Sequence, residues 1–203
     1  MIPLHKLCPD SCKQRKAFTA INAMKAYAKG LGVKDIANEV LDHTNFRSWS
    51  GSSKPEQHHY GDYGLAIHTY EVVSCCMLNA NFYNYDHDMS ELFLSALYHD
   101  SGKMWDYGCF GDNLKGTREW GPKEHKYKIH HLPRSAIFWN QCADKHEIDE
   151  EFAERVTHNI LSHHCEREWG SPVHPQSVCA WLLHLSDNMS ARLYEFGETN
   201  EES

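Results

Sequence analysis

The sequence lacks the features of membrane-spanning and secreted proteins. It has no apolar run close to the ~18 residues that a membrane-spanning helix requires. Its first residues, Met1–Lys6, contain no apolar stretch of the kind found in signal peptides. We therefore expect a cytoplasmic protein without membrane contact. Its 203 residues are enough to bury a substantial core.

Strand patterns and several enzyme motifs are also nearly absent. Alternating apolar and polar residues are scarce, which predicts an all-α fold. There is no Gly-rich phosphate loop, and no Ser-His-Asp or Cys-His arrangement is convincing. A net charge of −8 argues against a surface that binds nucleic acid throughout.

Eight cysteines without a secretory signal do not predict a disulfide framework. Four of them fall in apolar helical patterns, where a reduced cysteine behaves as a small hydrophobe. These four are Cys75, Cys76, Cys142 and Cys179. Cys8 and Cys12, with His5 nearby, form at most half of a zinc site because no second pair follows.

Apolar residues at helical spacing predict α-helix over most of the chain. Helices are expected at 12–30, 33–43, 65–80, 91–102, 129–144, 149–164 and 176–195. Residues 44–64 and 103–128 are expected to be loops, and the second is long enough to be functional. In the last helix, one stripe is expected to face the core and another to face a ligand. The core stripe is Val178, Leu182, Leu185 and Met189, and the ligand stripe is Ala180, His184, Asp187 and Ala191.

The 16 histidines are the anomaly of the composition, and their positions predict a metal site. His99 and Asp100 end an apolar helix, where they are costly to bury unless they bind something. His68 begins another helix, and Asp187 lies within the apolar last one. Divalent metals take neutral imidazole and carboxylate ligands from converging elements. We therefore predict that these four side chains hold one ion.

Two further histidines favour a second ion. His131 opens one predicted helix and His163 closes another. Asp100 has two carboxylate oxygens and is the natural bridge between ions ~3.5–4 Å apart. By contrast, the pair His87 and Asp88 lies in a polar stretch and is interpreted as a surface loop.

The order His…His-Asp…His…His…Asp resembles the HD superfamily of metal-dependent phosphohydrolases, over about Pro55–Arg192. The YhaM-type (cmp-binding-factor-like) 3′-5′ exoribonucleases are the most similar branch. The similarity is carried by HHY at 58–60, GLAIHT at 64–69, YHDSGK at 98–103, ILSHH at 160–164 and EWGSPV at 168–173. Two departures stand out: residues 1–50 are too few and too helical for the N-terminal OB-type domain of that branch, and its Gly-Gly-Leu-Leu stretch reads YGLA at 63–66.

The resemblance implies a helical bundle with its metal site between central helices. We expect a helical extension at 1–50, the HD domain at 51–196 and a disordered tail at 197–203. The cofactor would be one or two divalent ions, with manganese the first choice and iron, cobalt, nickel, zinc or magnesium as alternatives. The substrate would be a nucleotide or a short single-stranded nucleic acid; the oligomeric state is left open.

Other residues are assigned supporting roles. Lys103 completes the family's His-Asp-x-Gly-Lys pattern and is expected beside a bound phosphate, with Asp100 and His164 as the other catalytic residues. Arg134, Arg167, His59 and Trp169 are expected to bind substrate.

Three functions remain open at this stage. The first is cleavage of phosphoester or phosphodiester bonds, with 3′-5′ exonuclease activity as its specific form. The second is a nucleotidase or (deoxy)nucleoside triphosphohydrolase. The third is a di-iron oxygenase, because some HD proteins use the same ligand order to activate oxygen.

Overall fold

The computed structural model describes residues 10–85, 88–112 and 118–199, and this part is mostly helical. The all-α prediction is therefore confirmed. The elements are α1 (Asp10–Gly30), α2 (Lys34–Leu41), α3 (Thr44–Ser48), α4 (Gly64–Phe82), α5 (Met89–Tyr98), α6 (Lys103–Asp106), β1 (Tyr107–Asp112), β2 (Arg118–Pro122), α7 (Glu124–Lys128), α8 (His131–Lys145), α9 (Glu150–Ser162), the 3-10 turn η2 (Arg167–Trp169) and α10 (Val178–Thr199).

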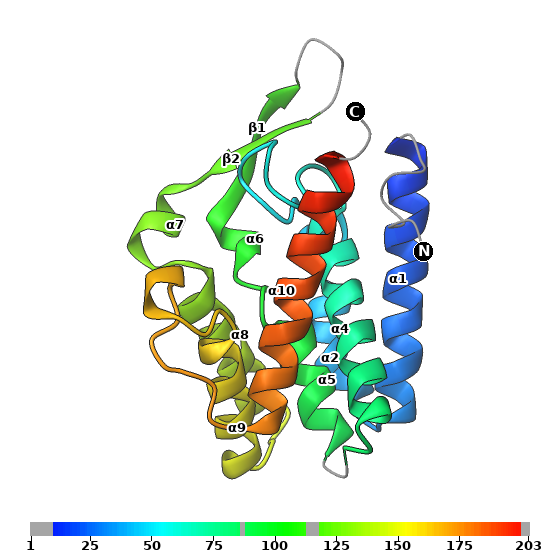
Figure 1. The fold of residues 1–203 in the computed structure, drawn as a ribbon, viewed down its shortest axis with the longest axis vertical. Coiled ribbons are helices and arrows are strands. Elements are labelled where there is room, and N and C mark those ends of the chain that lie inside the picture. Colours follow the sequence, from blue (N-terminus) through cyan, green and yellow to red (C-terminus); the bar gives the residue numbers. More distant parts are fainter. Residues whose placement is uncertain (1–9, 86–87, 113–117, 200–203) are drawn as a thin grey trace.

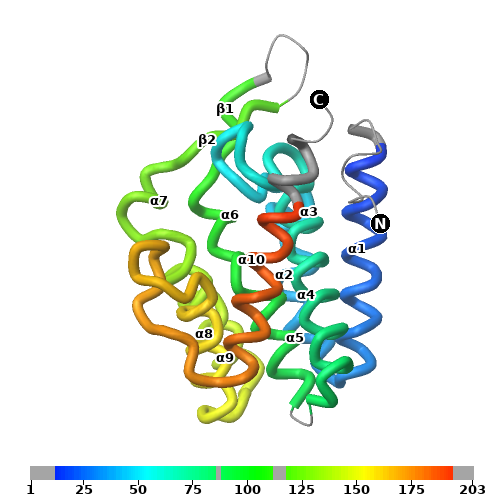
Figure 2. Tube along the Cα trace, in the orientation of Figure 1, coloured from blue at the N-terminus to red at the C-terminus, as the bar shows by residue number. Residues whose placement is uncertain are grey.

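Helix α4 is central to the bundle and packs against α1, α5 and α10. Figure 1 shows α10 in front of α4 and α5, with α1 on one side and α8 and α9 on the other. The trace in Figure 2 shows the early helix α4 beside the last helix α10. The largest fully buried side chains are Trp139, Tyr98, Phe46, Phe93 and Met24.

The N-terminal helices share this core. Ile21 of α1 and Val40 of α2 lie in the same buried cluster as Val72 of α4 and Leu92 of α5. Within the described residues, the predicted division near residue 50 does not separate two cores, and that boundary stays a prediction. Helix α10 continues to Thr199, into the predicted tail; residues 200–203 lie outside the described part.

Both predicted loops contain regular structure. Residues 44–48 form α3 inside the first, and the second contains α6, α7 and an antiparallel hairpin of β1 and β2. The hairpin was missed because its strands are short and rich in glycine, so no period-two pattern develops. It is held to the loop before α4 by Trp120, whose indole nitrogen donates to Asp62 at 2.7 Å.

The predicted core stripe of α10 was wrong for three of its four residues. Leu182 is buried, but Val178, Leu185 and Met189 are 55%, 53% and 46% exposed. Cys179 and Leu183 face the core instead.

No helix among the described residues is long and apolar enough to cross a membrane.

Candidate metal centre

Two glycines allow the backbone approaches that shape the site. A Cβ atom at Gly102 would lie 2.2 Å from the carbonyl oxygen of His131, so the turn after Asp100 packs directly on the start of α8. A Cβ atom at Gly64 would lie 1.9 Å from the carbonyl oxygen of His59. Both contacts require glycine. They explain why glycine follows the His-Asp pair and opens the helix that carries His68.

Four of the predicted ligands meet at one point. His68 Nε2 lies 3.2 Å from Asp100 Oδ2 and 3.1 Å from Asp187 Oδ1. His99 Nε2 lies 3.4 Å and 3.7 Å from the same two oxygens. These side chains come from α4, the turn after α5, and α10. Their donor atoms all lie within 4.8 Å of one another, a spacing that suits ligands of a single ion.

The other carboxylate oxygen of Asp100 faces the second pair of histidines. His131 Nε2 is 3.5 Å from Asp100 Oδ1, and His163 Nε2 is 3.9 Å from it. His164 also lies within 4.8 Å of both histidines. Asp100 therefore turns one oxygen toward each set, as a bridging carboxylate would.

The polar atoms at the centre fit a cation. Asp100 Oδ1, His131 Nε2 and His163 Nε2 are buried without a hydrogen-bond partner among the described residues. Unpaired buried polar atoms are costly unless they bind something. Burial lowers the pKa of His131 to about 3 and the pKa of His163 well below its usual value. Both imidazoles are therefore neutral, as metal ligands must be.

The first set holds positive charge even without an ion. Burial alone would lower the pKa of His99, but Asp100 and Asp187 outweigh it and raise that pKa to about 10. Lys103 Nζ pairs with Asp100 Oδ2 at 2.6 Å and is almost fully buried. Burial opposes ionisation of Asp100, yet Lys103 and the histidines hold its pKa well below the ordinary value. A divalent ion would take the place of the proton on His99.

The Nδ1 atoms of the candidate ligands His99 and His163 are hydrogen-bonded on the side away from the centre. His99 donates from Nδ1 to the carbonyl oxygen of Ala96 at 2.7 Å. His163 donates to that of Ile160 at 2.6 Å. Asp106 Oδ2 lies 3.4 Å from Nδ1 of His131. With the hydrogen on Nδ1, the lone pair is on Nε2, which faces the centre.

Glu71 extends this arrangement to His68 and His59. Its Oε2 accepts from Ser190 Oγ at 2.8 Å and from His59 Nε2 at 3.0 Å. Ser190 Oγ in turn lies 3.1 Å from Nδ1 of His68 and accepts from it. Burial works against ionisation of Glu71, but the bonds from His59 and Ser190 keep its pKa below the ordinary value. One carboxylate therefore orients a predicted ligand and a loop histidine together.

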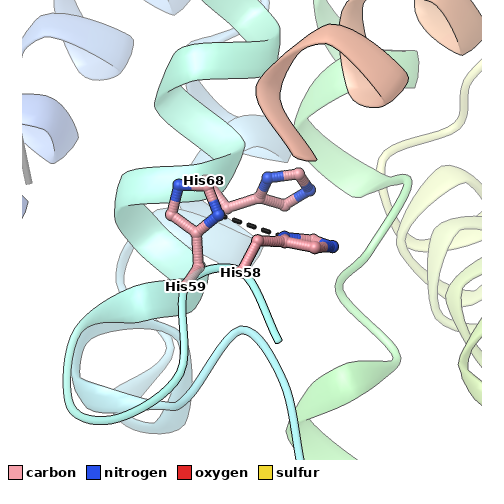
Figure 3. Close-up of side chains that lie close together, drawn as sticks. All are labelled: His58, His59 and His68. Atoms are coloured by element: carbon pink, nitrogen blue, oxygen red, sulfur yellow. Dashed lines mark hydrogen bonds between the residues drawn. The ribbon is translucent and has the colours of Figure 1, made fainter. Parts of the chain in front are cut away.

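His58, rather than His59, reaches the pocket. Figure 3 shows His58 and His59, on the loop before α4, close to His68 and joined to each other by a hydrogen bond. His59 Nε2 donates to Glu71, and His59 Nδ1 is hydrogen-bonded to His58 Nδ1 at 3.1 Å. His59 itself is 3% exposed, so its predicted substrate contact stays a prediction. Burial lowers the pKa of His58 to about 2, so its imidazole is neutral near pH 7.

A pocket of about 280 Å³ opens beside this centre, and its lining contains some of the predicted residues. Its walls are His58, His163, His164, Trp169, His184, Asp187, Asn188, Ala191 and Arg192. The exposed Trp169 lies on its wall, and its predicted substrate contact stays a prediction. His164 donates from Nδ1 to the carbonyl oxygen of Trp169 at 2.6 Å.

Two predicted substrate-binding arginines lie elsewhere. The Arg134 guanidinium stacks 4.0 Å from the ring centroid of Trp105, and Arg167 is exposed on η2. Neither lines the pocket, whereas Arg192 does. Their phosphate contacts stay predictions.

Sequence reasoning missed the residues that act through a partner. Asp106, Glu71 and Ser190 support ligand histidines, yet no motif links them to those ligands in the sequence. Asn188 and Arg192 follow Asp187 by one and five residues on α10, spacings that helical periodicity does not single out. Asp88, of the second His-Asp pair in the sequence, caps α5 by accepting from the backbone nitrogen of Ser90. His87 of that pair lies outside the described residues.

The predicted reduced state of four cysteines agrees with the structure. Cys75, Cys76, Cys142 and Cys179 are free. Cys12 is disulfide-bonded, so its thiol does not serve the weak zinc prediction; His5 and Cys8 lie outside the described residues.

Known proteins similar to this chain share the name 3′-5′ exoribonuclease YhaM. The one from Bacillus velezensis is 28% identical over 167 residues, which cover 79% of this chain and 46% of the relative. The one from Bacillus subtilis is 28% identical over 144 residues, covering 68% and 41%. The chain thus spans less than half the length of these relatives. No family model and no solved structure matches it.

Proposed function

We propose that this chain is a metal-dependent phosphohydrolase that cleaves phosphodiester bonds at the 3′ ends of short single-stranded nucleic acids. The observation that carries the proposal is Asp100, whose two oxygens each face a separate set of imidazoles. The relatives named as 3′-5′ exoribonucleases support the reaction and its direction. That this chain shares the activity of these longer relatives is part of the proposal.

The chemistry follows from the donor set. Bound divalent ions supply an acidified water molecule and offset negative charge on phosphate oxygens. His68, His99, Asp100 and Asp187 would hold one ion, and Asp100, His131 and His163 the other. Manganese suits the two carboxylates, whereas the four imidazoles also suit zinc, iron or nickel; we propose manganese as the first ion to test.

The protein's own groups bind substrate and move protons. Lys103 keeps Asp100 ionised through their buried ion pair. Its contact with the reacting phosphate is part of the proposal. Arg192 is the cationic residue in the pocket lining and is suited to a phosphate oxygen. His58 and His164 line the pocket, where an imidazole with a free ring nitrogen would accept a proton from an attacking water or a ribose hydroxyl.

The test is degradation of 5′-labelled single-stranded RNA by metal-free protein to which Mn²⁺ is added. We expect stepwise shortening from the 3′ end, and its loss in Asp100→Ala. Asp88→Ala is the matched control, since it removes the aspartate of the other His-Asp pair and costs only a helix cap, about 1 kcal/mol. Normal turnover in Asp100→Ala would contradict the proposal.

The same assay separates the other functions. Fastest turnover on mononucleotides would favour a nucleotidase, a function that the net charge of −8 also suits. Oxygen-dependent turnover with bound iron would favour the oxygenase. For the proposed reaction, affinity should fall with salt at a log–log slope of about −1 to −3, because few phosphates are contacted.

A further inference from the structure

The loop between α9 and α10 carries a second group of metal-binding side chains. Cys165, Glu166 and His174 place a thiol sulfur, a carboxylate oxygen and an imidazole nitrogen within 4.8 Å of one another. The sulfur of Cys165 lies 3.7 Å from Glu166 Oε1. Donors that share a tetrahedral zinc ion at ~2.0–2.3 Å lie roughly 3.3–3.8 Å apart. The observed spacing therefore needs little adjustment to hold an ion.

The backbone supports the thiol in an unusual conformation. Cys165 has φ +67°, in the left-handed region that side chains other than glycine and asparagine rarely adopt. Such a residue costs about 1 kcal/mol or more and persists where its surroundings hold it. Here the backbone nitrogen of Cys165 donates to the Ser162 carbonyl at 2.8 Å. The thiol is 7% exposed, whereas His174 is exposed.

The donors differ from those of the catalytic centre. All candidate ligands of that centre offer nitrogen or oxygen, and none belongs to this group. A thiolate selects zinc over manganese or magnesium. Three protein ligands leave the fourth position of a tetrahedral zinc ion for water.

We propose that Cys165, Glu166 and His174 form a separate zinc site that ties together the two ends of the loop segment carrying Trp169. The segment is already folded back by Ser171, whose backbone nitrogen donates to the Glu166 carbonyl at 3.1 Å. Trp169 and His164 of this loop line the pocket. An ion at this place would fix the rim of the pocket without taking part in the reaction. The zinc site does not depend on the proposed function.

Cobalt is the probe, because a cobalt–thiolate bond gives a charge-transfer band in the near ultraviolet. Cobalt at the nitrogen and oxygen ligands of the catalytic centre gives no such band. With the disulfide of Cys12 intact, we expect a band that saturates as cobalt is added and disappears when zinc displaces the cobalt. Absence of the band while cobalt binds would overturn the proposal.

Three variants assign the band. Cys165→Gly removes the thiol and relieves the positive φ, so it folds and should lose the band. Cys109→Ser, at an exposed free cysteine, should keep it. His174→Ala should weaken cobalt binding at least about 10- to 100-fold, since even loss of a residue that supports a ligand costs that much. A band that survives Cys165→Gly, or unchanged affinity in His174→Ala, would also overturn the site.

Discussion

At the scale of single residues, Glu71 shows how one buried carboxylate orients two histidines. The same oxygen, Oε2, accepts from His59 and from Ser190, and Ser190 accepts from His68. Both hydrogen bonds end on one oxygen, so a neutral amide oxygen in the same place can accept them as well. Position, more than charge, is what Glu71 contributes.

We predict that Glu71→Ala lowers metal affinity by about 10- to 100-fold, the usual effect of losing a residue that orients a metal ligand. Glu71→Gln should recover most of that loss. Calorimetric titration of metal-free protein with Mn²⁺ measures both. Equal affinities for Glu71→Ala and the parent protein would show that Ser190 orients His68 without it.

At the scale of elements, α10 has a different inner face from the one that its hydrophobic pattern predicts. Leu183 is fully buried, while Leu185 is 53% exposed. The helix is apolar on both sides, so hydrophobicity alone does not tell which side meets α4 and α5. The face with Asp187 and His184 turns toward the candidate metal centre. The small residues Ala180 and Ser190 are buried and allow close packing.

This difference predicts unequal costs for one substitution at two positions of α10. Leu183→Ala should lower the free energy of unfolding by about 2–5 kcal/mol, since it leaves a cavity in the core. Leu185→Ala should change it by no more than about 0.5 kcal/mol, as at other exposed positions. Urea unfolding measures both. Equal losses would mean that Leu185 is covered in solution.

At the scale of the whole molecule, the candidate metal centre joins elements that are distant in sequence. His68 of α4, Asp100 after α5 and Asp187 of α10 meet in one place, and His131 and His163 bring in α8 and α9. An ion bound there links most of the bundle and has no equivalent in the unfolded chain. Metal binding should therefore stabilise the fold.

We predict that Mn²⁺ at 100 times its dissociation constant stabilises the protein by about 2.7 kcal/mol. For a chain of this size, that corresponds to a rise in Tm of roughly 5–11 °C. A chelator should reverse the rise, and Asp100→Asn should abolish it. The same rise in Asp100→Asn would place the stabilising ion elsewhere. Thermal unfolding followed by circular dichroism is the measurement.

The sequence by itself determined the helical class and pointed to the candidate ligands of the centre. Helical periodicity is local, and a His-Asp pair in an apolar context is costly unless it binds something, so both are readable without a fold. The positions of His68, His99, Asp100 and Asp187 were predicted in this way, and the structure brings them together.

Only the tertiary structure decided which residues support those ligands. The partnership of Glu71 with Ser190 joins positions 119 residues apart, and that of Asp106 with His131 joins the short helix α6 to α8. The hairpin and the inner face of α10 also depend on neighbours rather than on local pattern. Hydrogen bonds and packing between distant segments form only when the chain closes on itself, and no local period in the sequence records them.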